Sequence, residues 1–547
     1  MKSDGLGGCL MRSGSTEFNV VGEVIAAPVG PAQRRAKLHS WRRRLPDISL
    51  CLTAFVTFAW LRNIPITHDV VWQFWVARQL SNGAVLYRDI WEVNPPLWFW
   101  SALPIHHAAA WLHVPPLRLL IAIIVGAGAF SALLMGHLSG DRSTLGRLVT
   151  MLLAFWLTVV MPLYDFGQRE QLALICALPY AALISRRSTD SAVPLTLALL
   201  VGALGAYGFA LKHYFIVVPL LLECWLIFRM RKQWRAIRPE TLTLIAAALA
   251  YGVATLTFAP AFITNAVPMA RTAYHGFESS WDMMFVRPWI VIWAFVAAFF
   301  LTFGGAFGRK AHPFVSTLLL VALGFGIAYL VQRKGWMYHS IPVTGAAALA
   351  LSLRLTMPDM RRAIPMTVGL FMLSLPILLP IKVGPYFNFF REQVDPLLST
   401  LPKGSPIFMA TGDPMWGWPT VEDHGLVWAS RLPSYWMIPA IAHAEVIGPN
   451  PAPLRALGRQ IQDQAAIEIR CASPAAIMFE RRGNYVFQPR AFDVQGFFLR
   501  RTEVRSYIER NYRELPPTRM LYMYRRITPP SAPPKGTNCP AFTRPLS

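Results

Sequence analysis

Eleven apolar stretches, each about long enough to cross a bilayer, constrain the fold of this chain more than any other feature. A membrane-spanning helix needs ~17 to 25 mostly apolar residues. Hydrophobic residues make up 54% of the 547 residues and charged residues 15%, which is more apolar surface than a soluble core can hide. The sequence therefore predicts a polytopic α-helical membrane protein. The stretches are residues 47–63, 117–138, 147–163, 171–185, 193–209, 214–229, 241–262, 288–307, 313–331, 338–354 and 364–382.

Basic residues lie in short clusters between these stretches, which indicates membrane topology rather than nucleic-acid binding. The polar first segment, residues 1–45, ends in the basic run QRRAKLHSWRRR and has no cleavable signal, so we expect it to be a disordered cytoplasmic N-terminus. With eleven spans every basic cluster then falls on the cytoplasmic side. The clusters are Arg142 with Arg147, Arg186 with Arg187, residues 229–238, Arg309 with Lys310, and Arg354 with Arg361 and Arg362.

Residues 97–115 are apolar enough to count as a twelfth span. A full crossing there would move most later basic clusters to the wrong side. We therefore predict a re-entrant or interfacial helix, and assign residues 46–384 to one transmembrane module whose first outer loop is residues 64–97.

Polar groups that are far apart in sequence share the outer face under this topology. The first outer loop carries Asp69, Asp89 and Glu92. Lys212 lies between two apolar stretches, where a buried Lys costs about 2.5–3.5 kcal/mol and needs a partner or a ligand. This convergence is the strongest functional signal in the chain. The other outer groups are YDFGQRE (164–170), His213, RTAYHGFESSWD (271–282) and QRKGWMYH (332–339).

Structural interpretations compete with each of these signals. Lys212 and His213 also suit a polar turn between two spans, and Arg333 and Lys334 also suit contacts with lipid phosphates. Asp69 opens an amphipathic segment, where an acid is often only a partner of the helix dipole. The tryptophans of the first outer loop equally suit an interfacial belt.

Four pieces of the sequence together resemble a known family. They are Asp69, NGAVLYRDIWEVNPPL (82–97), YGFALKHYFIVVP (207–219) and QRKGWMYHSIP (332–342). With the span pattern over residues 45 to 385, their order resembles the C-type superfold of glycosyltransferases, nearest the bacterial protein O-mannosyltransferase and lipid A aminoarabinose transferase group. The resemblance implies an inverting enzyme of the bacterial inner membrane. It would take a sugar from a polyprenyl-phosphate donor and pass it to a glycan, lipid or protein acceptor at the outer face.

Displacing a phosphate from an anomeric carbon requires cations at the leaving group and a carboxylate at the nucleophile. Each cation contributes about 4 kcal/mol before desolvation, at ~4 Å and an effective dielectric of ~20. Asp69 is the candidate general base. The candidates for positioning the acceptor or sugar are Asp89, Glu92, Asp165 and Arg169. The candidates for binding the donor phosphate are Lys212, His213, His275, Arg333, Lys334, Tyr338 and His339.

Some of these roles stay open. Asp89 either orients Tyr87 or Arg88 or positions the acceptor, and Arg169 either serves the site or pairs with Glu170 to cap a short helix. Relatives in the family use positions resembling Glu92 and His275 around a metal. One carboxylate and one His form a thin ligand set, so we expect no required cofactor and leave a divalent metal as the alternative.

Long apolar stretches are absent from residues 385–528. This absence predicts an extracytoplasmic, periplasmic α/β or α+β domain there, followed by a Pro-rich tail, residues 529–547. SPIFMAT (405–411), AAIMFE (475–480) and MLYMYRRI (520–527) are typical of buried strands, and VRSYIERNYREL (504–515) of an amphipathic helix.

The tryptophan-rich segment 413–441 suits either sugar binding or a lid packed on the membrane, with the lid favoured. Cys471 and Cys539, the only cysteines of this domain, are a candidate disulfide in an oxidising compartment.

A second function of a different class is a transporter or flippase of a lipid-linked saccharide. A transporter is expected to show repeated halves with broken helices at mid-membrane. The sequence shows no such repeat, and the charged groups gather at one face. The sugar, the prenyl length and the acceptor stay open at this stage.

Overall fold

The computed structural model describes residues 31–139, 143–307, 311–481, 487–530 and 539–540. Residues 1–45 and 46–547 form two separate compact units. Helix α1 (Pro31–Leu61) begins inside the segment predicted to be disordered, because the run from Ala32 onward is rich in good helix formers. Residues 1–30 lie outside the described residues.

Each of the eleven predicted spans contains a helix. Among the described residues, six helices are long and apolar enough to cross a membrane, and three shorter apolar ones accompany them. The protein is thus a multi-pass membrane protein, and the number of crossings stays a prediction. After α1 the helices of the module are α2 (His68–Ser81), α3 (Pro96–Leu112), α4 (Pro116–Leu138), α5 (Thr144–Phe155), α6 (Arg169–Arg187), α7 (Leu195–Ala210), α8 (Val217–Met230), α9 (Pro239–Phe258), α10 (Val267–Ala273), α11 (Trp281–Phe285), α12 (Pro288–Phe303), α13 (Pro313–Gln332), α14 (Ile341–Leu355) and α15 (Ala363–Val383).

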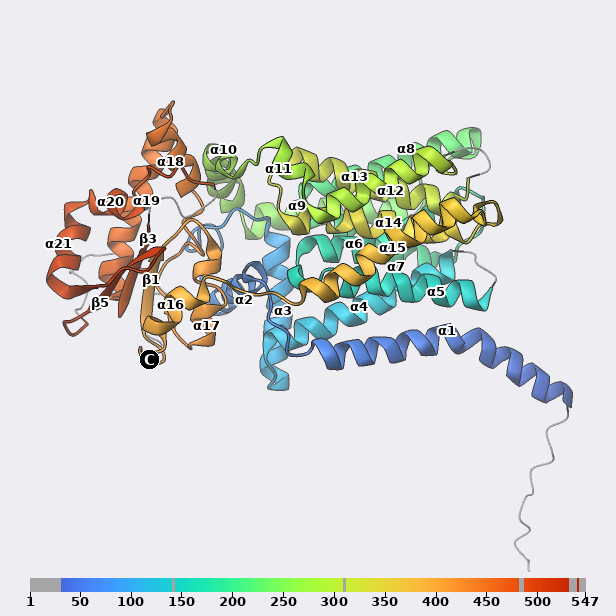
Figure 1. Cartoon of the computed structure of the whole chain (residues 1–547), viewed down its shortest axis with the longest axis horizontal. Coiled ribbons are helices and arrows are strands. Elements are labelled where there is room, and N and C mark those ends of the chain that lie inside the picture. The colour runs from blue at the N-terminus through green and yellow to red at the C-terminus, as the bar shows by residue number, and fades with distance from the viewer. Residues whose placement is uncertain (1–30, 140–142, 308–310, 482–486, 531–538, 541–547) are drawn as a thin grey trace, which may run out of the picture. The chain divides into compact units, whose positions relative to one another are not determined.

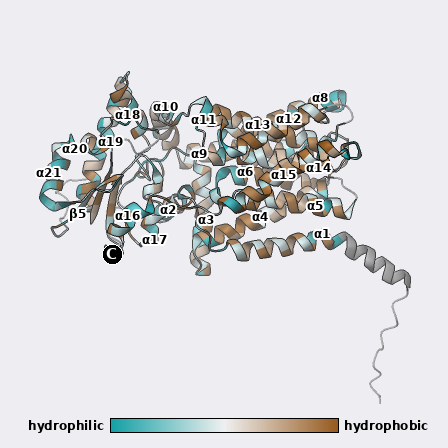
Figure 2. Ribbon diagram, viewed as in Figure 1, coloured by the Kyte–Doolittle hydropathy of each residue, from teal (hydrophilic) through white to brown (hydrophobic). Residues whose placement is uncertain are grey.

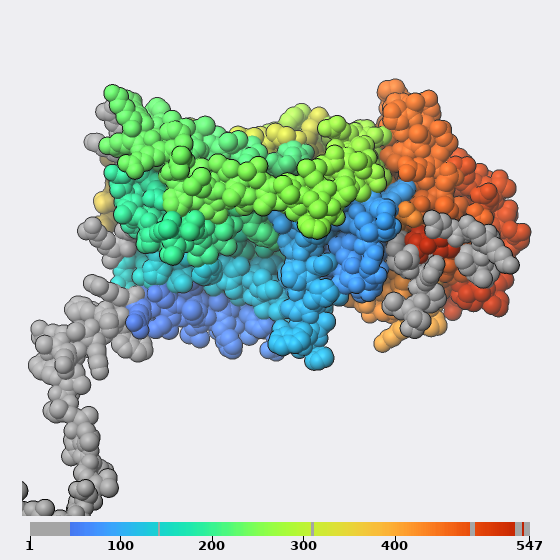
Figure 3. All heavy atoms as spheres, turned by 180° about the vertical axis from the view of Figure 1, so that it is seen from behind, coloured from blue at the N-terminus to red at the C-terminus, as the bar shows by residue number. Residues whose placement is uncertain are grey.

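Helices α4 to α9 and α12 to α15 run alongside one another, whereas α3 lies across their ends (Figure 1). The view from behind shows the same crossed arrangement for the chain near residue 100 (Figure 3). This orientation supports the prediction that residues 97–115 form an interfacial or re-entrant helix. Hydrophobic residues concentrate along the bundle (Figure 2). Only 6% of the apolar stretch of α9 is buried inside the protein, which is the expected state of a helix whose surface faces lipid.

Residues 385–528, predicted to be a separate domain, belong to the same compact unit as the helical bundle and contain a mixed five-stranded sheet in the order β2-β1-β3-β5-β4. β1 is parallel to β2 and β3, and β5 is antiparallel to β3 and β4, with Ile407 opposite Ala476 and Ile477 opposite Tyr524. The strands are β1 (Pro406–Ala410), β2 (Val427–Trp428), β3 (Ala476–Glu480), β4 (Tyr512–Leu515) and β5 (Leu521–Arg526). The helices are α16 (Arg391–Leu398), α17 (Thr420–Asp423), α18 (Ile438–Val446), α19 (Ala452–Ala472), α20 (Val494–Leu499) and α21 (Thr502–Asn511).

The three predicted strands of this domain are confirmed as β1, β3 and β5. The helix predicted over residues 504–515 is correct only up to Asn511, where α21 ends. The next four residues form β4 because they pair with β5, which overrides their local helical pattern.

The tryptophan-rich segment packs against the 64–97 loop. The Trp418 ring lies 5.5 Å from the ring of Trp75 in α2, and both side chains are buried. Arg78 of α2 forms a two-point ion pair with Glu422, at 2.6 and 3.0 Å. These contacts place residues 413–441 on the 64–97 loop, and both packing on the membrane and sugar binding stay predictions.

Cys471 and Cys539 form the predicted disulfide, with Cα atoms 5.6 Å apart and a sequence separation of 68. Closing a loop of that length lowers the entropy of the unfolded chain by an amount worth about 4 kcal/mol. We expect Cys471→Ser to lower the melting temperature of the C-terminal domain, and reduction of the wild type to do the same. Differential scanning calorimetry in detergent, with Cys224→Ser as the control, measures this. Equal melting temperatures with and without a reductant would contradict it.

Candidate active site

Asp69 lies in the first turn of α2 and is buried, with 6% of its surface exposed. One carboxylate oxygen, Oδ2, accepts a hydrogen bond of 2.7 Å from Nε2 of Gln168, which also donates to Oγ1 of Thr67. The other oxygen lies 3.4 Å from Nε2 of His68. The helix dipole favours an acid here, but the contact with Gln168 also fixes Asp69 against the start of α6.

Lys212 is fully inside the module, and its ammonium group has three partners. Nζ lies 2.5 Å from Oε1 of Glu170, 2.9 Å from Nε2 of His339 and 3.2 Å from Oε1 of Gln332. The backbone of Lys212 is extended between α7 and the next helical turn, which directs its side chain inward and leaves His213 exposed. The prediction that Lys212 needs a partner is confirmed, and the polar-turn interpretation holds for His213 alone.

Arg169 follows Gln168 and is also buried. Its Nη1 donates to Oδ1 of Asn94 at 2.5 Å, and its guanidinium lies 4.5 Å from the ring of Trp98. No carboxylate forms a salt bridge with it within the described part of the chain. The interpretation that Arg169 and Glu170 pair to cap a helix is therefore wrong, because the two side chains bind different partners.

Lys334 and Arg333 are neighbours in sequence but point to different surroundings. Lys334 is buried, donates from Nζ to the backbone carbonyl of Tyr274, and lies 4.1 Å above the ring of that tyrosine. Burial lowers its pKa to about 8. Arg333 adopts the left-handed conformation that ends α13, so its side chain is 41% exposed and pairs with Glu278 at 3.2 Å. The prediction that Arg333 joins the phosphate site is not supported by this placement.

His339 is buried where three cations meet. Arg169, Lys212 and Lys334 all lie within electrostatic range of its imidazole. Because an ammonium only donates, Nε2 accepts from Lys212 and the ring proton is on Nδ1. That Nδ1 has no hydrogen-bond partner among the described residues. We call these four side chains the cation cluster, and Tyr338 packs its ring 5.5 Å from Lys212 beside them.

Asp69 and the cation cluster are held by one segment. Gln168 donates a hydrogen bond to Asp69, and Glu170 accepts one from Lys212. Arg169, between them in sequence, belongs to the cation cluster. The predicted meeting of an acid and basic residues from distant parts of the sequence is therefore present in the structure. Sequence reasoning missed Gln168 as the partner of Asp69, although it belongs to the recognised YDFGQRE element.

Two further acids are buried near this segment. Burial raises the pKa of Asp165 to about 8, with the charges of Asp69 and Glu170 adding to the effect, so Asp165 is protonated at neutral pH and suited to donate a hydrogen bond. Burial also raises the pKa of Glu92. Its Oε1 accepts from the backbone and side chain of Asn94, and this links Glu92 to Arg169.

Two predicted site residues lie elsewhere. Asp89 accepts hydrogen bonds from the backbone of Val85 and from Arg88, which makes it the stabiliser of an exposed turn rather than a site residue. His275 lines a cavity beside α18, whereas Glu92 lines a different one. No group of three or more His, Cys, Asp or Glu ligands occurs in the described ranges, and a metal near these two residues stays a prediction.

An apolar groove of about 360 Å³ includes Gln73, one helical turn after Asp69, and Gly167, next to Gln168, in its lining. The rest lies between α2, α3, α4, α6 and α7 and is almost wholly apolar. Its apolar lining includes Phe74, Ile105, Leu120, Ile123, Ile124, Ala127, Phe130, Leu172, Ile175 and Leu204.

No protein-family model and no curated protein sequence matches the chain. The structure is similar to arabinofuranosyltransferase AftD from mycobacteria, with 14% identity and a TM-score of 0.44 over 89% of this chain and 40% of that one. It is also similar to two structures of the oligosaccharyltransferase from Archaeoglobus fulgidus. One, AglB with an inhibitory peptide and a dolichol-phosphate, has 9% identity and a TM-score of 0.40 over 80% of this chain and 70% of that one. The other, tethered to an acceptor peptide, has 11% identity and a TM-score of 0.42 over 89% of this chain and 75% of that one.

These proteins are glycosyltransferases, the class that the sequence resemblance implies. This chain spans less than half the length of AftD. At these identities and TM-scores the likeness carries no argument for a reaction, so the function is argued from the site itself.

Proposed function

We propose that the protein is an inverting glycosyltransferase that moves a sugar from a polyprenyl-phosphate donor to an acceptor hydroxyl at the outer face of the membrane. The observation that carries the proposal is the buried cation cluster beside Asp69. It holds three charged side chains, and Glu170 is the one carboxylate in salt-bridge contact with them among the described residues. Uncompensated buried cations are costly, and an anionic ligand offsets that cost.

The reaction fits the two ends of the site. Asp69 takes the proton of the acceptor hydroxyl, whose oxygen then attacks the anomeric carbon of the donor sugar. The bond from that carbon to the phosphate oxygen breaks, and its electron pair leaves with the polyprenyl phosphate. Attack from the side opposite the leaving group inverts the anomeric configuration. Arg169 and Lys334 stabilise the negative charge that develops on the phosphate.

The cations have different parts in this scheme. Glu170 neutralises Lys212, so Lys212 mainly orients Glu170, Gln332 and His339. Arg169 and Lys334 keep unused donors, since Nε of Arg169 has no partner and Lys334 donates to a single carbonyl within the described structure. A planar guanidinium and an ammonium together suit a phosphate diester. Nδ1 of His339 adds a neutral donor.

The apolar groove supports a lipid-linked substrate. It lies mostly among helices predicted to span the membrane, and its lining includes Gln73, one turn after Asp69, and Gly167, next to Gln168. A prenyl chain has no hydrogen-bonding groups and needs such a lining. The groove thus supports a donor whose sugar reaches the site while its tail stays in an apolar environment.

Release of polyprenyl phosphate from a panel of synthetic polyprenyl-phosphate sugars tests the proposal. The purified protein in detergent is incubated with glucose, mannose, galactose and arabinofuranose donors, together with cell-envelope extract as the acceptor source. Mass spectrometry is expected to show release of the lipid phosphate and a glycosylated product from at least one donor. Binding of a donor without product from any of them would favour a transporter.

Donor capture is expected to weaken as pH rises through about 8. Burial holds the pKa of Lys334 at about 8, below the ordinary value of a lysine, so Lys334 is charged below that pH and neutral above it. The kcat/KM for the donor should therefore fall up to about tenfold per pH unit above 8. Lys334→Arg keeps its charge and is expected to flatten this fall. Identical profiles for the two proteins would show that Lys334 is not the titrating group.

A further inference from the structure

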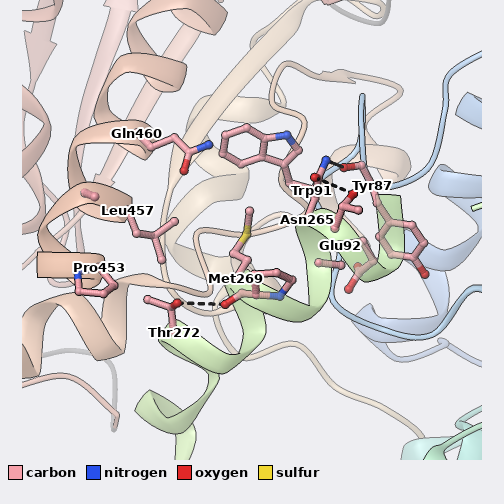
Figure 4. A pocket seen from close by; sticks show the side chains of 13 residues that line it. Tyr87, Trp91, Glu92, Asn265, Met269, Thr272, Pro453, Leu457 and Gln460 are labelled. Atoms are coloured by element: carbon pink, nitrogen blue, oxygen red, sulfur yellow. Dashed lines mark hydrogen bonds between the residues drawn. The ribbon is translucent and has the colours of Figure 1, made fainter. Parts of the chain in front are cut away.

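A second cavity, of about 400 Å³, opens where the 64–97 loop, α10 and α19 meet. Figure 4 shows side chains from these three segments directed into it. Trp91 and Glu92 come from the loop, Met269 and Thr272 from α10, and Gln460 from α19. The remaining lining residues are Tyr87, Thr264, Asn265, Ala266, Pro268, Pro453, Ala456 and Leu457.

The chemistry of this lining matches a carbohydrate. An indole ring offers a flat apolar face to sugar C–H groups, while amides, hydroxyls and a carboxylate bind sugar hydroxyls. Glu92 is buried, and its Oε2 has no hydrogen-bond partner among the described residues. No Lys or Arg lines the cavity. The lining therefore does not suit a phosphate or another anion, and the small amount of apolar surface does not suit a lipid chain.

The cavity continues along α19 into an open groove of about 410 Å³. The two share Trp91, Ala456 and Gln460, and the second adds Arg459 and Asp463. We call the two together the α19 groove. Its polar and charged side chains recur along the exposed face of one helix, at Arg459, Gln460 and Asp463.

The inner end of the α19 groove adjoins the active site. Glu92 accepts a hydrogen bond from the side chain of Asn94, which in turn accepts one from Arg169 of the cation cluster. A chain lying in the groove with its end at Glu92 would thus place a terminal hydroxyl toward Asp69. The apolar groove is lined by other residues, from α2, α3, α4, α6 and α7.

We propose that the α19 groove binds the acceptor and that the acceptor is a glycan chain. The inference rests on the proposed function and selects one acceptor class from the glycan, lipid and protein that the sequence leaves open. Trp91 stacks on one sugar of the chain, Gln460 and Asn265 bind its hydroxyls, and Glu92 accepts a hydrogen bond from the unit nearest the reacting end.

Binding of soluble oligosaccharides to the full-length protein tests this inference. Saturation-transfer NMR in detergent is carried out with linear tetrasaccharides of glucose, mannose, galactose and arabinofuranose, and with a Ser/Thr-rich peptide. At least one tetrasaccharide is expected to bind, and the peptide is not. Trp91→Leu and, separately, Gln460→Ala should each weaken that binding about tenfold or more. Trp111→Leu, at an 80% exposed tryptophan of α3, is the matched control and should bind as the wild type does.

Cleavage of the lipid donor by water separates the two proposals. Gln460→Ala, on the exposed face of α19, is expected to retain donor hydrolysis while losing transfer to the glycan. The inference is overturned if no tetrasaccharide binds, if both groove variants bind as the wild type does, or if the peptide competes at the groove. In those cases donor cleavage by the wild type would leave the proposed function standing. Absence of cleavage with every donor would instead count against the function.

Discussion

Replacing Asp69 by Asn is expected to lower the rate of sugar transfer about 1,000-fold. General-base catalysis contributes roughly 10²- to 10⁴-fold, and an amide cannot take the acceptor proton. Asn has the shape of Asp, and its oxygen can still accept the hydrogen bond from Gln168, so the fold should be retained. Release of polyprenyl phosphate gives the rate, and equilibrium binding of the donor gives its affinity. Donor affinity is expected to change by less than about threefold.

Asp89→Asn is the matched control for this variant. Asp89 lies in the same 64–97 loop, but it is bound to Arg88 and Val85 in an exposed turn. Its replacement should leave transfer near the wild-type rate. If Asp69→Asn transfers sugar at more than a tenth of the wild-type rate, Asp69 is not the base and a transporter gains support. A fall in donor affinity that matches the fall in rate would assign Asp69 to donor binding.

Lys212→Met is expected to destabilise the protein by about 3–5 kcal/mol, because it leaves the carboxylate of Glu170 buried without its cation. Removing both charges in Lys212→Met with Glu170→Met is expected to recover most of that loss, since the cost comes from the unpaired charge. Thermal unfolding in detergent, followed by tryptophan fluorescence, measures the relative stability of the wild type, Lys212→Met and the double variant.

Arg78→Met provides the comparison for Lys212→Met. The Arg78–Glu422 pair has similar short distances, but it is partly exposed, so its loss should cost about 1 kcal/mol or less. An equal loss of stability in Arg78→Met and Lys212→Met would show that burial does not set the strength of the Lys212 pair. Greater destabilisation in the double variant than in Lys212→Met would contradict the ion-pair argument.

Hydropathy and charge patterns predicted the helices and the need of Lys212 for a partner. Both follow from strong constraints. Apolar segments must be helical in a bilayer, and a buried lysine must find a partner. The identity of that partner could not be predicted, since Glu170 is 42 residues away and several outer acids were available. Only packing of α6 against α7 selects it.

Side-chain direction was the least predictable property of the site. Lys334 turns inward and Arg333 outward because the chain adopts a left-handed conformation at Arg333, and no residue pattern in QRKGW distinguishes the two. His275 belongs to the same sequence segment as Tyr274, which contacts Lys334, yet it lines another cavity. Sequence places such residues on a face of the membrane, and tertiary packing decides which of them reach the centre.

One turn of α6 carries the contacts to both the base and the leaving-group end of the site, through Gln168, Arg169 and Glu170. A tilt or shift of this helix, such as a change in bilayer thickness induces, would move Arg169 together with the hydrogen-bond partners of Asp69 and Lys212. The spacing between Asp69 and Arg169 would then be less sensitive to lipid composition than the access of the substrates. The surrounding grooves could then change during evolution to bind new sugars and acceptors, while the distance between Asp69 and Arg169 stayed the same.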